Sequence, residues 1–231
     1  MDFNNLLFVI FPYVALFSAV VVTIYRSITR PFTISSLSSQ LLERRQLYWG
    51  SIPFHWGVTI ILTFHLVAIF LPQTIVLWNA VPLRLFLIEI TGIGLGIWAL
   101  AGLVILTWRR ASVARIRVVS TPMDYIILVA LLASLVTGVL TAILYRWGSS
   151  WFVGLFTPYI WSILTFKPNA AAIAPLPFII KLHVFNAWLL TLLFPFSRLV
   201  HIFTWPLAYL LRPWQIVIWL RRPQNRTALG K

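Results

Sequence analysis

The chain has 231 residues, of which 61% are hydrophobic and 10% charged, and its formal net charge is +14. Soluble domains are about half apolar and about a quarter charged, so this composition excludes an ordinary soluble domain. The absence of cysteine excludes disulfides, thiolate-bound iron–sulfur clusters and covalently attached c-type haem in this chain. Since no RNA-binding motif accompanies the positive charge, we expect no nucleic-acid partner.

Five apolar runs are each long enough to cross a bilayer, which takes a helix of about 20 residues. They lie at about residues 6–25, 53–71, 85–108, 124–145 and 178–203. We expect bends at Pro12 and Pro195, because proline removes a helix hydrogen bond. Asp2 precedes the first run where a signal peptide would be basic, so we expect a retained helix. The sequence therefore predicts an all-α integral membrane protein, a single domain over 1–231 with five transmembrane helices.

The segment between the fourth and fifth runs is apolar but is interrupted by four prolines, Pro158, Pro168, Pro175 and Pro177. Its aromatic residues are typical of a helix that lies at the membrane interface; they include Trp151, Tyr159 and Trp161. A sixth, shorter span is the second interpretation.

Loop charges predict the orientation. The loops after the first and third runs and the C-terminal tail carry most of the basic residues: Arg26, Arg30, Arg44, Arg45, Arg109, Arg110, Arg115, Arg117, Arg212, Arg221, Arg222, Arg226 and Lys231. The other side carries Asp2, Arg84, Arg146 and Lys167. The positive-inside rule then places the N-terminus outside and the C-terminus in the cytoplasm, with membrane lipid around the bundle.

All four histidines fall within two of the runs, His55 and His65 in the second and His183 and His201 in the fifth. Ionisable groups inside a bilayer are costly and usually functional, although a single histidine can also serve as a hydrogen bond between helices. Because the two runs cross in opposite directions, the histidines pair by depth. His55 pairs with His201 near the cytoplasmic face, and His65 pairs with His183 near the outer face.

Each pair offers two ligands at one depth. Zinc prefers four ligands around one point, whereas haem iron needs only two axial ligands besides its porphyrin nitrogens. In straight helices, His55 and His65 differ in rise by ~15 Å, and His183 and His201 by ~27 Å. A bend near Pro195 or helix tilt has to absorb the difference. The sequence predicts two haem b groups in an electron carrier.

Four charged residues near the cytoplasmic side have individual interpretations. Arg198, one helical turn before His201, and Arg110, at the end of the third run, are candidates for contacts with haem propionates. Anchoring at the interface explains them equally well. We predict that Asp124 caps the fourth helix and that Glu43, among arginines, is a solvated or partner-facing charge.

Several motifs resemble one known family. LLFPFSRLVHI at 192–202 closely resembles the signature near the last helix of the gamma subunit of membrane-bound respiratory nitrate reductase. SSQLLERRQLYWGSIPFH (38–55), WRR (108–110) and KLH (181–183) are similar to that family as well, so the resemblance covers essentially the full length. It implies the same ligand pairs as the topology, for an inner and an outer haem.

The resemblance also implies a place in an oxidoreductase complex of the prokaryotic cytoplasmic membrane. Members of the family oxidise quinol near the outer face and pass electrons from the outer to the inner haem. An iron–sulfur subunit on the cytoplasmic side receives the electrons and feeds a molybdenum-containing catalytic subunit. The chemistry on the terminal substrate would therefore take place in another chain.

The family pattern differs from this chain at the quinone site. Well-studied members have a glycine before the second histidine and a lysine in the following outer loop, where this chain has Phe64 and NAVPLRLFLIE. Arg84 is a candidate quinone-site residue in place of the lysine, although a guanidinium is not an ammonium. Glu89 is a second candidate. Interface anchoring for Arg84 and capping of a helix's first turn for Glu89 are the simpler explanations.

Three alternatives stay open. A related cytochrome b of a nitrite-oxidising, sulfite or heterodisulfide system would use the same ligands with a different electron donor or direction. A haem-free transporter would use the histidines as proton relays, but it would be expected to contain more acidic residues in its spans than Glu89 and Asp124. A haem-free anchor gives no reason for histidines matched in depth.

Overall fold

The computed structural model describes residues 3–34 and 38–204, and within these ranges it contains helices and no β-strand. The long helices are α2 (Phe11–Thr29), α3 (Arg45–Phe70), α5 (Pro82–Ser112), α7 (Pro122–Leu144) and α10 (Phe178–Leu193). The short helices are α1 (Phe3–Asn5), α4 (Pro72–Asn79), α6 (Ala114–Val118), α8 (Gly148–Trp151), α9 (Thr157–Leu164) and α11 (His201–Thr204). The C-terminal basic residues and Asp2 lie outside the described ranges.

Five helical segments have the length and hydropathy of membrane spans, which confirms the predicted all-α membrane fold. They are Phe3–Thr29, Arg45–Phe70, Pro82–Ser112, Pro122–Leu144 and Phe178–Phe196. The first four begin earlier than predicted, because polar residues and prolines extend a helix beyond its apolar run. Pro53 lies inside α3, and a π-helical turn at Leu6–Ile10 precedes Pro12.

The fifth span ends earlier than the predicted residue 203, because the chain leaves α-helical geometry after Leu193. A 3₁₀ turn at Phe194–Phe196, an extended Ser197 and a second 3₁₀ turn at Arg198–Val200 separate α10 from α11. Pro195, expected to bend the helix, lies inside the first of these turns.

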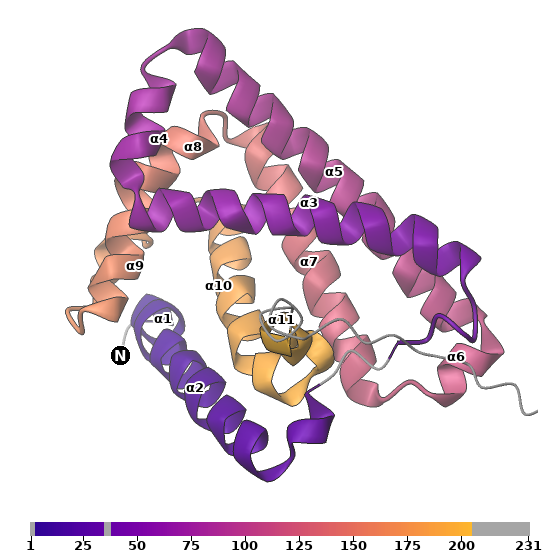
Figure 1. Cartoon of the computed structure of the whole chain (residues 1–231). Helices are drawn as coiled ribbons and strands as arrows, with labels where there is room; N and C mark the ends of the chain where they lie inside the picture. The colour runs from indigo at the N-terminus through magenta and orange to yellow at the C-terminus, as the bar shows by residue number, and fades with distance from the viewer. Residues whose placement is uncertain (1–2, 35–37, 205–231) are drawn as a thin grey trace, which may run out of the picture.

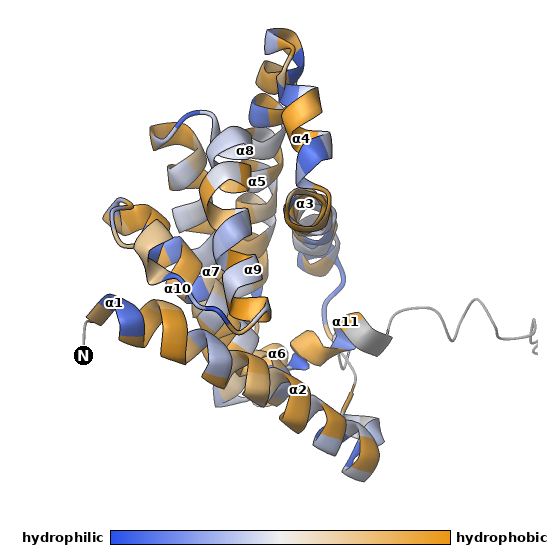
Figure 2. Ribbon diagram, turned by 90° about the vertical axis from the view of Figure 1, so that its left-hand side faces the viewer, coloured by the Kyte–Doolittle hydropathy of each residue, from blue (hydrophilic) through white to orange (hydrophobic). Residues whose placement is uncertain are grey.

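The helices pack in the order α3, α5, α7, α10 and α2, with α3 and α5 making the most extensive contact. Small residues permit this approach. A Cβ added to Gly57 would lie 2.8 Å from Ala99 Cβ, and one added to Gly102 would lie 2.6 Å from Gly50 O. Within the described residues, α3 and α10 are not among the close helix pairs. Figure 1 shows α3 crossing α7 and α10, and Figure 2 shows it to one side of them.

Side-chain contacts group the loops at two ends of the bundle. The "basic end" contains residues 26–34, 38–45, 109–121 and 194–204, which Arg26, Arg109 and Arg198 connect by hydrogen bonds. At the "opposite end", Asn79 and Glu89 connect the second and fourth loops through Ser149. The arginine-rich loops therefore share one end, as the sequence predicted; which end faces the cytoplasm stays a prediction.

The segment between α7 and α10 forms α8, a π-helical turn at Phe152–Phe156, and α9. It is not one of the five candidate spans. Tyr159 is fully buried there, donates to Phe8 O at 2.8 Å and accepts from Trp188 Nε1 at 3.2 Å. Tyr159 is therefore a core residue and not the interface residue that we predicted.

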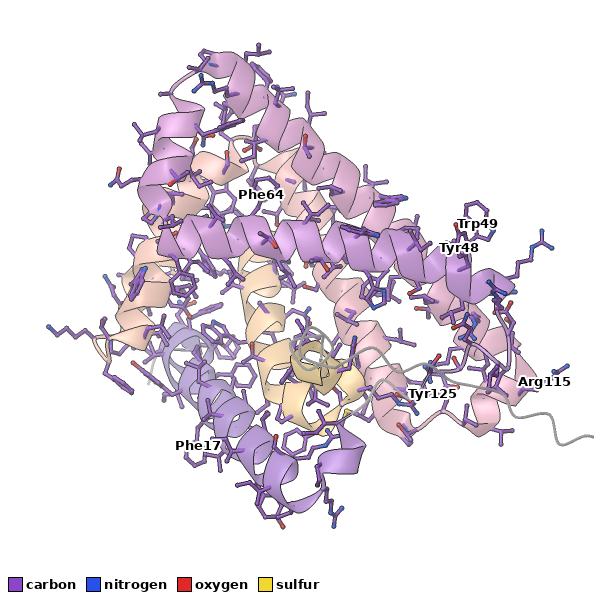
Figure 3. All side chains as sticks on the ribbon, viewed as in Figure 1. Phe17, Tyr48, Trp49, Phe64, Arg115 and Tyr125 are labelled. Carbon is purple, nitrogen blue, oxygen red and sulfur yellow. The ribbon has the colours of Figure 1, made fainter. Side chains whose placement is uncertain are left out.

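Large apolar side chains cover the outside of the helices, as expected where lipid is the solvent. Phe17 is 70% exposed and projects away from the bundle (Figure 3). Trp49 also projects outward from α3, whereas Arg115 extends from the basic end (Figure 3).

Candidate functional site

Three helices carry the four histidines. His55 and His65 lie on α3, while His183 lies on α10 and His201 begins α11. The rings of His55 and His201 face each other, with centroids 6.3 Å apart and planes inclined by 64°. A metal–imidazole nitrogen bond is about 2 Å long, so the centroids of two rings on opposite sides of one metal ion lie about 6 Å apart. The observed separation therefore fits two axial ligands of one metal ion.

Backbone carbonyls define the tautomer of three of the rings. The Nδ1 atom lies 2.8 Å from Ser51 O in His55, 2.8 Å from Ile61 O in His65 and 2.7 Å from Arg198 O in His201. A carbonyl oxygen only accepts, so each Nδ1 carries the hydrogen and the lone pair is on Nε2. Metal-binding histidines commonly donate their other ring nitrogen to a carbonyl, which fixes ring orientation and tautomer.

His183 has a hydroxyl in place of a carbonyl. Its Nδ1 lies 3.0 Å from Thr137 Oγ1, and that hydroxyl donates its own hydrogen to Ala133 O at 2.6 Å. The hydroxyl therefore accepts from His183, and the same tautomer results. Gly138, next to Thr137, leaves room for the ring, since an added Cβ would lie 3.0 Å from His183 Cε1.

The second pair consists of His65 on α3 and His183 on α10, and both side chains are partly buried. The His65 ring also contacts the Phe152 ring edge-on, at 5.1 Å and 83°. Thr141, one helical turn from Thr137 on α7, is 7% exposed and its hydroxyl has no hydrogen-bond partner among the described residues. An orphaned buried hydroxyl calls for a partner, and a polar group of a bound cofactor would provide one.

The donor sets fit haem better than a protein-bound zinc ion. Within residues 3–34 and 38–204, no cluster of three or more histidine, cysteine, aspartate or glutamate side chains could hold a metal ion. Two neutral imidazoles with lone pairs on Nε2 are instead the axial ligand set of six-coordinate haem iron. The 6.3 Å spacing of His55 and His201 and the fixed tautomers of both rings fit that cofactor.

Arg110 and Arg198, the candidates for propionate contacts, converge on one carboxylate at the basic end. Arg198 Nε lies 2.9 Å from Asp124 Oδ1, and Arg110 Nη1 lies 3.1 Å from Asp124 Oδ2. Asp124 also forms a capping box with Thr121 at the start of α7, which confirms its predicted cap. Two guanidinium groups share one carboxylate, so the cluster keeps an excess positive charge near His201.

The two candidate quinone-site residues, Arg84 and Glu89, lie at the opposite end of the bundle. Arg84 is exposed and stacks on the Trp78 ring at 5.6 Å, as expected of an anchor at an interface. Glu89 accepts from the backbone N–H groups of Gly148 and Ser149 at 3.1 Å and 2.8 Å. It therefore caps the first turn of a helix, as predicted, and that helix is α8.

Sequence reasoning missed the contacts of Arg26, Arg109 and Glu43. Arg109 is 3% exposed, and its Nε lies 2.7 Å from Glu43 Oε2, so Glu43 is not the solvated or partner-facing charge that we predicted. Arg26 donates to backbone carbonyls after α10. A signal was present for Glu43: with four acidic residues against 18 basic ones, each carboxylate is expected to find a cation.

Comparison with known proteins gives consistent matches along the chain. The sequence model of the family described as "Nitrate reductase gamma subunit" matches residues 4–220. The "Nitrate reductase gamma chain" of Bacillus subtilis (strain 168) is 34% identical over 217 residues, which cover 92% of this chain and 97% of that protein.

Two further relatives belong to other organisms. The "Respiratory nitrate reductase 1 gamma chain" of Escherichia coli (strain K12) is 30% identical over 223 residues, 94% of this chain and 98% of that protein. The "Nitrate reductase-like protein NarX" of Mycobacterium tuberculosis is 28% identical over 237 residues, 96% of this chain but 36% of that protein.

Proposed function

The chain belongs to the nitrate reductase gamma subunit family, and from that premise we propose that it is a dihaem cytochrome b that carries electrons across the membrane. The observation that supports this most directly is the facing pair His55 and His201, with ring centroids 6.3 Å apart. His55 and His201 would hold one haem b, and His65 and His183 the other. Haem held by these residues would supply one-electron transfer.

Hydrogen bonds within the protein position the four histidine ligands. The acceptors on Nδ1, namely Ser51 O, Ile61 O, Arg198 O and Thr137 Oγ1, fix the tautomer and the orientation of each imidazole. Arg110 and Arg198 supply positive charge near His201, where propionate groups would be neutralised. That charge also favours the reduced state of a haem bound there, which would draw electrons toward the basic end.

We place quinol oxidation at the opposite end, near His65, on the outer side of a prokaryotic cytoplasmic membrane. Arg84 is exposed there and available to an anionic quinone oxygen. Protons released outside and electrons moved inward separate charge across the membrane, which involves about 2.3 kcal/mol per charge per 100 mV. The basic end would then face the cytoplasm, as the positive-inside rule predicts.

The electron acceptor would be an iron–sulfur subunit docked at the basic end, followed by a molybdenum-containing catalytic subunit. Arg115 extends from this end into solvent and is suited to an acidic partner surface (Figure 3). The terminal reduction of nitrate would take place in that partner, so this chain is the anchor and electron-transfer subunit of the oxidoreductase.

The acidic residues of the spans do not favour a proton-relay transporter. Among the described spans these residues are Glu89 and Asp124. Glu89 accepts hydrogen bonds at the N-terminus of α8, and Asp124 is paired with two arginines. Neither carboxylate contacts a histidine through a hydrogen bond in the described residues, so a continuous relay lacks its acidic members.

Reduced-minus-oxidised optical spectra with pyridine haemochrome quantification test the proposal on the purified full chain. We expect two b haems per chain, and one after His65→Ala or His201→Ala introduced separately. A folded preparation with no haem would refute the dihaem function. A haem count of two that neither substitution lowers would refute the ligand assignment.

A further inference from the structure

His201 directly follows a break in the fifth helix, which extends over residues 194–200. From His183 to Leu193, α10 rises about 15 Å, which equals the rise of about 15 Å between His55 and His65 on α3. After Leu193 the chain leaves the helix axis, and Figure 2 shows α11 displaced from α10 toward the side of α3. The chain therefore bends near Pro195, one of the two ways in which the unequal spacing of the histidine pairs could be absorbed.

Such a break leaves backbone carbonyls without helical partners, and these carbonyls need other donors. Arg26, from the last turn of α2, supplies them: its Nη1 donates to Pro195 O at 2.7 Å and to Ser197 O at 3.0 Å. Thr33 fixes the rest of the guanidinium by accepting from Nε at 2.8 Å and from Nη2 at 2.6 Å. The positive charge also suits the C-terminal end of α10, where the helix dipole is negative.

A second side chain, Asp124 at the start of α7, also holds the 194–200 segment. Asp124 Oδ1 lies 2.9 Å from Arg198 Nε, and Arg198 Nη2 also donates to Val119 O at 3.1 Å. The carbonyl of the same Arg198 accepts from His201 Nδ1 at 2.7 Å. The position of Asp124 is itself fixed by its capping box with Thr121. A chain of contacts therefore leads from the start of α7 to the orientation of the His201 ring.

We infer that Arg26 and Asp124 are positioning residues, which hold the 194–200 segment from two sides so that the His201 ring faces His55. The inference rests on the proposed function, because it concerns the axial ligand of the haem held by His55 and His201. Each positioning residue acts through main chain or through Arg198, and their removal is expected to affect one haem and spare the other.

The test compares three full-length variants by redox titration and low-temperature electron paramagnetic resonance, with His201→Ala identifying the signal of its haem. Arg26→Gln removes the charged donor from Pro195 and Ser197. Asp124→Asn keeps an acceptor for the Thr121 N–H but loses the charge opposite Arg198. Arg30→Gln is the matched control, because Arg30 is exposed, belongs to the same loop and carries the same charge.

We expect Arg26→Gln and Asp124→Asn each to shift the midpoint potential and the g-values of the haem of His55 and His201, or to lower the haem content from two to one. The other haem, and both haems of Arg30→Gln, should match the unsubstituted protein. If Arg26→Gln does not fold, Arg26→Lys replaces it, since an ammonium keeps the charge but not the fork. Signals of the His201 haem unchanged in both positioning variants would overturn the inference.

Hydrogen–deuterium exchange gives a readout that does not depend on haem. The N–H of Ser197 donates to Phe194 O at 3.2 Å, and the N–H of Leu199 donates to Ser197 Oγ at 3.1 Å. Both amides should exchange faster in Arg26→Gln than in Arg30→Gln. Equal exchange in the two variants would also overturn the inference, whereas an unsubstituted protein without haem would instead refute the proposed function.

Discussion

His183 on α10 donates from Nδ1 to the hydroxyl of Thr137 on α7, at 3.0 Å, and that hydroxyl is committed as a donor to Ala133 O. The other three histidines of the chain use backbone carbonyls as acceptors, which a substitution does not remove. Thr137 is therefore a side-chain acceptor, which mutation can delete.

Thr137→Val keeps the side-chain volume and removes this acceptor. We expect weaker haem binding at the pair of His65 and His183, by about 10- to 100-fold, which is typical when an outer partner of a metal ligand is lost. Thr137→Ser keeps the hydroxyl and should match the unsubstituted protein. Haem retention during dialysis measures the effect, and equal retention in the valine and serine variants would contradict it.

A second prediction concerns the pair of Glu43 and Arg109. Arg109 is 3% exposed, so Glu43→Gln leaves a buried guanidinium without its carboxylate. Breaking a buried pair in this way costs about 3 kcal/mol. Denaturation in detergent micelles should detect the loss in the single variant. The double variant Glu43→Gln, Arg109→Gln should recover part of it, and additive losses would contradict the coupling.

The same pair predicts a pH dependence. Desolvation alone would raise the pKa of Glu43, but hydrogen bonds from the Gln46 and Leu47 amides and from Arg109 lower it below its ordinary value of 4.5. A lowered folded-state pKa gives stability that is fully present above 4.5 and is lost as the pH falls through the folded pKa. Unfolding measured across this range should be less dependent on pH in Glu43→Gln than in the unsubstituted protein.

The spans and the ligand residues could be predicted from the sequence because both depend on local composition. Hydropathy marks the apolar runs, and histidine is rare enough there to be noticed. The end of α10 could not be predicted fully: Pro195 indicated a bend, but the extended Ser197 depends on Arg26, which is 169 residues away from Pro195 in the chain. Such tertiary contacts leave no periodic pattern in the sequence.

The contacts of polar side chains were harder to predict than the spans and the histidines. Glu89 could be recognised as a cap, but not of which helix, since the N-terminus of α8 reaches it only in the folded bundle. Tyr159 has an aromatic ring of the kind expected at the membrane interface. It is instead fully buried, and its hydroxyl donates to Phe8 O. In both cases the residue type favours several environments, and packing decides among them.

A fourth prediction follows from the cap that Glu89 provides. Glu89→Gln removes the negative charge from the N-terminus of α8 and should lower stability by about 1 kcal/mol. Both haem spectra should stay unchanged, because Glu89 contacts Gly148 and Ser149 and no histidine by a hydrogen bond in the described ranges. Quinol oxidation rates measured on the same variant separate this role from a quinone site: a lost rate at unchanged stability would contradict the cap.

The last prediction concerns the glycines that allow α3 to approach α5. A Cβ added to Gly102 would lie 2.6 Å from Gly50 O and 2.7 Å from Phe54 N, and backbone atoms cannot move aside as a flexible side chain can. Gly102→Ala should therefore push α3 away from α5 and cost about 1–3 kcal/mol, as overpacking does.

Because α3 carries His55, the same displacement should alter the His55–His201 spacing and lower the haem content. Gly94→Ala is the matched control on the same helix, since nothing lies within 4 Å of its added Cβ. Alanine favours helix over glycine by about 1 kcal/mol, so this control should be neutral or more stable. Equal haem content and equal melting temperature in the two variants would show that the approach of α3 to α5 does not determine the ligand geometry.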